Sequence, residues 1–190
     1  AATKEGKILG VRATSWSGMG AYLSTAAPGI PTILHGLMLS GCYDIPAVKE
    51  DVYGIYTNGT PVEAYRGAGR PEATFILERT IDMLAAKLGK DPTEIRMKNF
   101  IPKFENGHTV ATGLIYDSGN YAGSLQKLLD HAGYTQLRRD QAEARKKGRY
   151  LGIGVATYVE ICGLGPSQVA GAVGFQGGLW ESAIVRFHPT

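Results

Sequence analysis

Two arginines and two glycines lie directly before a helix start signal in the stretch Tyr65-Arg66-Gly67-Ala68-Gly69-Arg70-Pro71. Glycine adopts backbone conformations closed to other residues and lets the chain approach a ligand closely. Pro71 suits the first turn of a helix, where its missing N–H leaves no hydrogen bond unmade. The unpaired N–H groups of that turn, beside two guanidinium groups, favour an anionic or polar ligand. The residues alone predict an anion site, or else arginines that pair with Glu63 and Glu72.

A strand and a long helix are expected to position this loop. Val52 to Asn58 alternates β-branched and aromatic residues with others, which is typical of a strand, and Asn58-Gly59-Thr60-Pro61 has the composition of a turn. After the loop, apolar residues recur at three- and four-residue spacing, which predicts a helix with one buried face and with Gly89 as its C-cap. These apolar residues are Phe75, Ile76, Leu77, Ile81, Leu84 and Leu88.

The residues before this unit predict a strand and a short helix. Lys7 to Trp16 is near-alternating, so we expect a strand whose partner is antiparallel. A short helix is expected at 32–39, after a proline-rich turn. His35 in that helix invites a metal or catalytic interpretation, because imidazole is a common ligand. No second His, Cys or acid lies at ligand spacing, so we assign no metal ligand and expect a structural role or a place facing a substrate channel.

Helix caps and a surface segment are predicted in the middle of the chain. Asp91-Pro92-Thr93-Glu94 has the form of a capping box, with a helix that ends near Asn99. Residues 100–113 carry turn residues and little periodicity, so we expect a surface excursion and a domain boundary. Asp117-Ser118 is expected to cap a helix over 121–131.

The last third of the chain predicts one exposed helix and two strands. Residues 135–147 are dense in charge, and strand composition returns at 151–161 and 181–188. Gly152 and Gly154 lie inside an apolar strand pattern, so we reject a dinucleotide-binding fingerprint. Helices and strands that follow one another in this way predict the α+β class.

Composition disfavours several functional classes. The formal net charge is +3, and the basic clusters at 138–139 and 145–149 are interpreted as a solvated helix face and not as a nucleic-acid site. No apolar run is long enough to span a membrane and no signal peptide pattern opens the sequence, so we expect a cytoplasmic protein. Cys42 and Cys162 are too few for a zinc or iron–sulfur motif, and we expect both to be buried.

The arginine loop and its flanks resemble the active-site loop of the molybdenum hydroxylases, the xanthine oxidase and aldehyde oxidase family. The resemblance is greatest to large subunits described as carbon monoxide dehydrogenase-like, and it is carried by Tyr56 to Pro61 followed by Ala64 to Ala73. Further supporting runs occur in the family's order. They are Gly20–Ser24, Asp91–Arg96, Lys98–Pro102, Tyr116–Tyr121 and Gly163–Ser167.

The resemblance implies an α+β portion of a molybdopterin-binding large subunit, with mixed and antiparallel strands packed with helices. Residues 1–102 would be the C-terminal part of the first molybdopterin-binding subdomain, 103–150 a surface loop with connector helices, and 151–190 the start of the second subdomain. The sequence lacks the family's Gly-Gly-x-Phe-Gly motif, its Gly-Gln-Gly-His-type loop and its catalytic glutamate. We therefore interpret the chain as an internal piece of a larger protein or of a divided subunit, inactive alone.

The resemblance also implies a set of site residues. Arg66 would be catalytic and, with Gly67, Ala68 and Gly69, would bind a molybdenum–molybdopterin cofactor, expected in its cytosine dinucleotide form. His35 and Phe175 would line the substrate pocket.

The implied activity is oxidation of an aldehyde or an N-heterocycle with water as the oxygen source. The implied partners in a hetero-oligomer are the remainder of the large subunit, an iron–sulfur small subunit and an FAD-containing medium subunit. True carbon monoxide dehydrogenases carry a copper-binding cysteine just after the loop arginine, whereas this chain has Gly67 there, so carbon monoxide oxidation is disfavoured. A non-catalytic scaffold fragment is the alternative.

Overall fold

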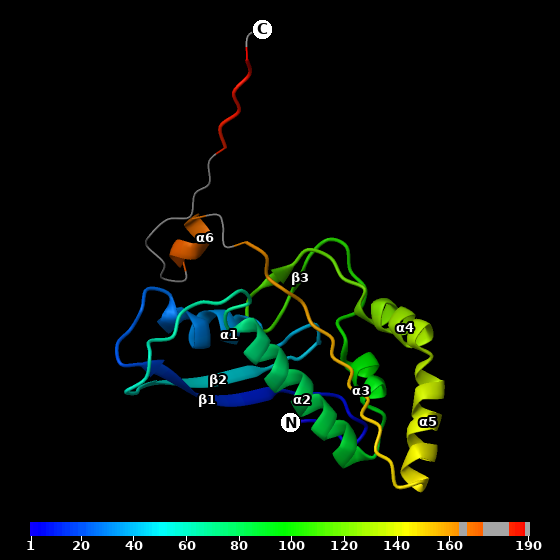
Figure 1. Cartoon of the computed structure of the whole chain (residues 1–190). Coiled ribbons are helices and arrows are strands. Elements are labelled where there is room, and N and C mark those ends of the chain that lie inside the picture. Colours follow the sequence, from blue (N-terminus) through cyan, green and yellow to red (C-terminus); the bar gives the residue numbers. More distant parts are fainter. Residues whose placement is uncertain (164–166, 173–182, 189–190) are drawn as a thin grey trace. The chain divides into compact units, whose positions relative to one another are not determined.

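The computed structural model describes residues 1–163, 167–172 and 183–188 (Figure 1). Contacts divide the chain into two units, Ala1–Val159 and Glu160–Thr190. The second unit contains α6 (Ser167–Ala172). The first unit contains the following elements, in chain order: β1 (Val11–Gly20), a 3₁₀ turn η1 (Ala27–Gly29), a π-helical turn η2 (Ile30–Leu34), α1 (His35–Leu37), β2 (Val48–Tyr56), α2 (Arg70–Leu88), α3 (Pro92–Asn99), β3 (His108–Thr109), β4 (Ile115–Tyr116), α4 (Tyr121–Ala132) and α5 (Tyr134–Lys146). The predicted α+β class is confirmed, while the three-part division of the parent subunit stays a prediction.

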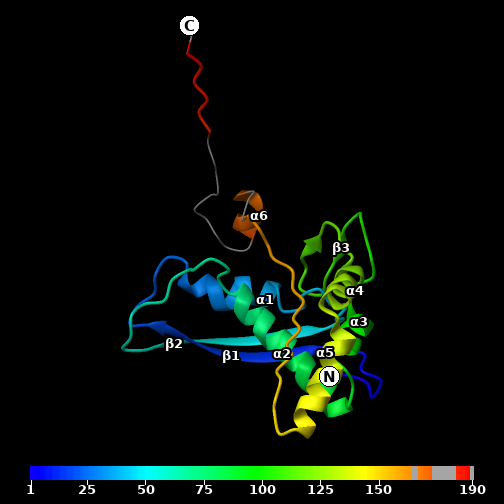
Figure 2. The same ribbon diagram turned by 45° about the vertical axis from the view of Figure 1, so that its right-hand side comes forward.

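Strands β1 and β2 pair in parallel, with Val11 opposite Val48 (Figure 2). The expectation of an antiparallel partner is therefore wrong. Between the two strands the chain passes through η1, η2 and α1, and such a crossover carries it back to the end where β1 began. The register shifts between Gly18 and Gly20. Helix α1 thus lies between two paired strands in the sequence, and this places His35 beside the sheet.

Helix α2 is the long helix that the sequence predicted, and Gly89 ends it with a φ of 64°. Five of its residues are buried. They are Ala73, Leu77, Glu78, Ile81 and Ala85. Phe75, in contrast, is 70% exposed, so its expected burial is wrong. At 100° per residue, Phe75 lies about 200° from Leu77 and therefore on the opposite face.

Helix α3 begins at the predicted cap, where Asp91 accepts hydrogen bonds from the N–H and the hydroxyl of Thr93. The side chain of Glu94 pairs with Lys90 and not with the backbone N–H of Asp91, so only the Asp91 half of the predicted capping box forms. Helix α4 is capped by Asn120, which accepts from the N–H of Gly123, and not by Asp117-Ser118. Helix α5 has no buried residue, as its charge density predicted.

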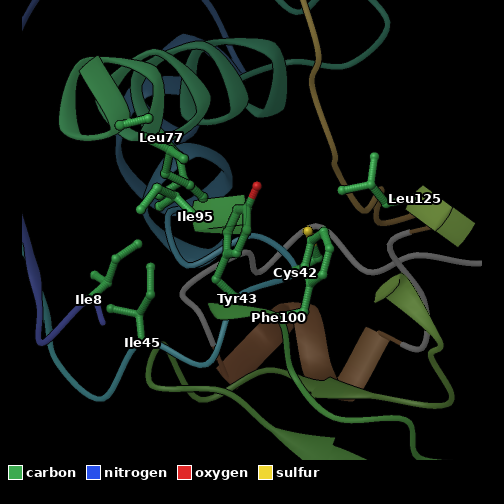
Figure 3. Close-up of a cluster of buried hydrophobic side chains, with 10 residues drawn as sticks. Ile8, Cys42, Tyr43, Ile45, Leu77, Ile95, Phe100 and Leu125 are labelled. Carbon is green, nitrogen blue, oxygen red and sulfur yellow. The ribbon is translucent and has the colours of Figure 1, made fainter. Parts of the chain in front are cut away.

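The core of the first unit gathers side chains from the N-terminal segment, the turn after α1, α2, α3 and α4 (Figure 3). The rings of Tyr43 and Phe100 stack with centroids 5.3 Å apart. Phe100, Ile101 and Val110 are buried, so the segment 100–113 is not the pure surface excursion that was expected. Its backbone is anchored by the antiparallel pair β3 and β4.

Residues 151–161 form no strand, contrary to the prediction, and neither do residues 183–188 within the described part of 181–188. The alternation in the first segment is nevertheless real, because Val155 and Val159 pack against the core while their neighbours are exposed. The segment is extended, and it is held by side-chain contacts in place of a backbone ladder. Cys42 is buried as expected, whereas Cys162 is exposed, which corrects that part of the prediction.

Candidate functional site

The loop between β2 and α2 is held in a conformation that requires its glycines. Gly67 has a φ of 103° and Gly69, the N-cap of α2, a φ of 84°, a region that residues with a Cβ rarely adopt. The N–H of Ala68 donates to the carbonyl of Tyr65 at 2.9 Å, and the N–H of Arg70 donates to that of Gly67 at 3.0 Å. Pro71 lies in the first turn of α2, as predicted. The loop is therefore a built turn that leads into a helix of 19 residues.

Gly69 packs directly on the helical turns before β2. A Cβ at this position would lie 2.4 Å from the carbonyl oxygen of Ile30 and 2.8 Å from the backbone nitrogen of His35. Such contacts essentially never occur, so only glycine allows the loop to lie so close to this segment. The structure thus brings together two predicted site residues, Gly69 and His35.

His35 forms a buried pair with Glu50. Its Nδ1 lies 2.6 Å from the Glu50 Oε1, and the two side chains are 3% and 9% exposed. The same carboxylate oxygen accepts from the Ser15 hydroxyl at 3.4 Å, and the same Nδ1 lies 3.3 Å from the carbonyl oxygen of Pro31. Burial raises the pKa of Glu50, while the imidazole and the hydroxyl act in the opposite direction. The Nε2 of His35 is buried and has no hydrogen-bond partner among the residues that the structure describes.

A cavity of about 330 Å³ adjoins this pair, at the lower end of the size range of ligand pockets. Strand β1 contributes a tryptophan and three hydroxyl residues, η2 contributes apolar residues, and α2 contributes its first turns. The lining residues are Thr14, Ser15, Trp16, Ser17, Ile30, Pro31, His35, Gly69, Glu72 and Ile76. Thr14, Ser15, Ser17, His35 and Glu72 are polar, so the lining mixes polar and apolar residues and is not predominantly apolar.

The guanidinium of Arg66 is exposed and does not line this cavity. In the described part of the chain, the N–H groups of Gly67 and Gly69 form no hydrogen bond, whereas those of Ala68 and Arg70 are bonded within the loop. Gly69 is buried, so the donors open to a ligand are the N–H of Gly67, the exposed guanidinium of Arg66 and the N-terminus of a long helix, which together suit an anionic, oxygen-rich group.

Sequence reasoning missed Glu50 and Trp16. Glu50 lies in a strand rich in polar residues and far from His35 in the sequence, so no local spacing marks the pair. The sequence placed Trp16 in a strand but did not predict that β2 is the partner strand, in which Tyr53 lies opposite Trp16 and stacks on its ring. Phe175, predicted to line the substrate pocket, lies outside the described residues.

The profile of the molybdopterin cofactor-binding domain matches residues 1–100. The chain belongs to this family. The matched range contains the loop, the His35–Glu50 pair and every residue that lines the cavity. The family resemblance that the loop and its flanks indicated is thereby confirmed.

The chain is similar to several oxidoreductases whose chains are much longer than this one. The large chain of carbon monoxide dehydrogenase from Hydrogenophaga pseudoflava is 41% identical, over 100% of this chain and 24% of its own length. The aldehyde oxidoreductase of Megalodesulfovibrio gigas is 30% identical, over 82% of this chain and 17% of its own. The crystal structure of quinoline 2-oxidoreductase from Pseudomonas putida 86 superposes with a TM-score of 0.78 at 30% identity, covering 88% of this chain and 21% of that one.

The chain spans about a quarter of the length of the curated relatives it matches. Within the residues that the structure describes, no group of three or more His, Cys, Asp or Glu side chains is arranged to hold a metal ion. No helix in the same part of the chain has the length and hydropathy needed to cross a membrane.

Proposed function

We propose that this chain is part of the large subunit of a molybdenum-dependent hydroxylase that oxidises an aldehyde or an N-heterocycle with water as the oxygen source. The observation that carries the proposal is the family match over residues 1–100, which contains the loop packed through Gly69 on the turn that bears His35. The names of the relatives support the substrate classes, because one is an aldehyde oxidoreductase and another a quinoline 2-oxidoreductase.

The loop is proposed to hold the cofactor. Arg66 contributes an exposed guanidinium and Gly67 a free N–H group to an oxygen-rich, anionic pterin, and Gly69, which is buried, contributes the positive φ that sets the turn of the loop. Ala68 contributes its small side chain, because its N–H already donates to Tyr65. When bound, the molybdenum–molybdopterin supplies the redox and hydroxylation chemistry, and the residues of this chain bind and orient it. The cofactor is proposed to be in the cytosine dinucleotide form.

The substrate is proposed to be organic. Gly67 and Ala68 leave room beside the loop, and the cavity lined by His35 offers a space of suitable size with both apolar and polar lining residues. A glycine after Arg66 cannot ligate copper, so carbon monoxide oxidation at a copper–molybdenum pair is disfavoured even though a carbon monoxide dehydrogenase large chain is among the relatives. Phe175 is proposed as an aromatic wall of the same pocket.

The proposed partners are the remainder of the large subunit, an iron–sulfur small subunit and an FAD-containing medium subunit. One relative is the large chain of carbon monoxide dehydrogenase, and a large chain implies an assembly of several chains. The chain alone is proposed to be inactive, because most of a large subunit lies outside it.

The assembled enzyme tests the proposal. Molybdenum and copper are measured together, and turnover is assayed with benzaldehyde, quinoline and carbon monoxide. We expect molybdenum without copper, and turnover of an organic substrate that falls about 100-fold or more in Arg66→Ala, because a removed oxyanion-type donor has an effect of this size. Arg139→Ala, which removes an exposed arginine of α5, is the matched control and should keep full turnover. Undiminished activity in Arg66→Ala would remove that residue from the site, and a metal-free assembly would favour the scaffold alternative.

A further inference from the structure

One edge of strand β1 has no partner strand among the described residues. The N–H of Val11 donates to the carbonyl of Ala47, the residue before β2. The backbone groups of successive residues in a strand point to opposite sides, so the odd-numbered residues of β1 face β2. The even-numbered residues from Arg12 to Gly18 therefore direct their N–H and C=O groups to the other side. Within the described ranges these groups form no backbone hydrogen bond, and we call this side the open edge of β1.

The open edge is long and has little protection against pairing. Strand β1 has 10 residues, and an unpaired edge of this length is a template for another strand. Proteins that leave an edge exposed usually shield it with charged residues, prolines or a very short strand. Strand β1 contains no proline, Arg12 is its only charged residue, and Trp16 is 70% exposed. These features indicate an edge that is covered in the complete protein.

The first residues of the chain already begin a ladder on this side. The N-terminal nitrogen of Ala1 donates to the carbonyl of Gly10 at 2.8 Å, and the N–H of Gly10 donates back at 3.4 Å. Such an exchange is the hydrogen-bonded pair of an antiparallel ladder. The carbonyl of Ala1 also accepts from the N–H of Leu9, so two residues oppose one, as in a β-bulge. Ala2 and Ile8 form an antiparallel bridge. Because Gly10 is even-numbered, this ladder lies on the open edge and sets its direction.

We propose that an antiparallel strand from the remainder of the large subunit covers the open edge of β1 and extends the ladder that Ala1 and Gly10 begin. The occupant is assigned to the same subunit because the ladder has already begun on this edge and because the curated relatives are about four times longer than this chain. The inference rests on the proposed function, because it assigns the strand to the rest of that subunit. In the extended ladder the N–H groups of Arg12, Thr14 and Trp16 donate to the added strand.

Hydrogen exchange in the complete large subunit tests this pairing. Exchange is read amide by amide along β1, by mass spectrometry with fragmentation after the exchange step. The amides of Ala13 and Ser15 face β2 and are the protected reference in the same strand. We expect the amides of the three edge residues, Arg12, Thr14 and Trp16, to exchange within about tenfold of that reference. An open edge would instead give slow and fast amides in alternation along β1, and this pattern would overturn the inference.

A pair of variants at one edge position separates strand pairing from simple burial. Thr14→Pro removes the N–H, whereas Thr14→Val, the matched control, keeps it with a side chain of similar shape. A proline is excluded from a paired position, so Thr14→Pro should speed the exchange of Arg12 and Trp16 by about tenfold or more. Thr14→Val should leave both rates unchanged. Unchanged rates in Thr14→Pro would show that the amides are protected without a paired strand, which overturns the inference.

Two further outcomes identify the occupant and keep this test apart from the proposed function. Protection that disappears on dilution would mean that a second copy of the chain covers the edge, and the assignment to the same subunit would then be wrong. Protection that is independent of protein concentration supports that assignment. No measurement here uses turnover or metal content. A subunit without molybdenum or activity would contradict the proposed function, and the exchange pattern of β1 would still decide the pairing.

Discussion

The carboxylate of Glu78 and the guanidinium of Arg96 form an ion pair at 2.9 Å in which the arginine side chain is fully buried. Tyr43 donates its hydroxyl to the same carboxylate at 2.5 Å, and the backbone N–H of Thr157 donates to it at 2.8 Å. Burial, together with the neighbouring thiol of Cys42 and the carboxylate of Glu78, raises the pKa of Tyr43 far above its usual range, so its hydroxyl remains a donor. The pair therefore joins α2, α3, the core and the extended segment 151–159.

Arg96→Met is expected to lower the free energy of unfolding of the chain by about 3–5 kcal/mol, because it leaves the Glu78 carboxylate buried without a positive charge. Urea unfolding followed by circular dichroism measures the change. Lys103→Met removes one partner of the exposed Lys103–Glu105 ion pair and should change the free energy by about 1 kcal/mol or less. If both variants lost the same free energy of unfolding, the buried Glu78–Arg96 pair would contribute no more to stability than the exposed pair does.

Gly69→Ala is expected to destabilise the chain more than Gly89→Ala. Both glycines have positive φ, so a Cβ at either position costs about 1–2 kcal/mol of backbone strain. A Cβ at position 89 meets nothing within 4 Å, whereas one at position 69 meets the backbone of Ile30 and of His35. The second contact should add about 1–3 kcal/mol of overpacking. Urea unfolding of the two variants checks the difference, and equal destabilisation would contradict the close approach of the loop to the turn before β2.

Local signals were enough to predict the loop and the helices that frame it. Gly67 and Gly69 have the positive φ that their residue type allows. Pro71 and Asp91 mark the starts of α2 and α3 and Gly89 marks the end of α2, as predicted. These predictions succeeded because turn and cap chemistry depends on neighbours in the sequence.

Predictions that depended on tertiary partners were wrong or incomplete. The expected antiparallel partner of β1 failed because strand direction is set by the crossover and not by the alternation of residues. Residues 151–161 alternate as a strand does, but they form no strand. The backbone N–H of Thr157 donates its hydrogen bond to the carboxylate of Glu78 and not to a neighbouring strand. Glu50 was missed because its contact with His35 is formed by the fold and is not marked by any regular spacing in the sequence.

Cys42 is expected to resist thiol reagents in the folded chain. Burial is the largest of the causes that raise the pKa of its thiol to about 12, so almost no reactive thiolate exists at pH 8. Cys162 is exposed and should react. Labelling with a chromogenic disulfide reagent should therefore count one thiol per folded chain and two in denaturant. Cys162→Ser should reduce the folded count to zero, and a persisting fast signal in that variant would show that Cys42 is accessible.

Asp91→Ala is expected to lower the free energy of unfolding by about 1 kcal/mol at pH 7, because the side chain caps α3. Burial alone would raise the pKa of Asp91, but the hydroxyl and N–H of Thr93, the hydroxyl of Tyr134 and the charge of Arg138 outweigh it, and the pKa is lowered.

A lowered pKa in the folded state means that the carboxylate contributes its full stability above its unfolded pKa of about 4, and loses it as the pH falls through the folded value. The stability difference between wild type and Asp91→Ala should therefore be constant from pH 7 to about pH 5 and shrink on further acidification. Asp140→Ala, in exposed α5, should show a difference of less than about 0.5 kcal/mol at every pH. A gap between wild type and Asp91→Ala that stays constant down to pH 3 would mean that the cap acts without its charge, and the ionised carboxylate would then have no part in holding α3 against Tyr134.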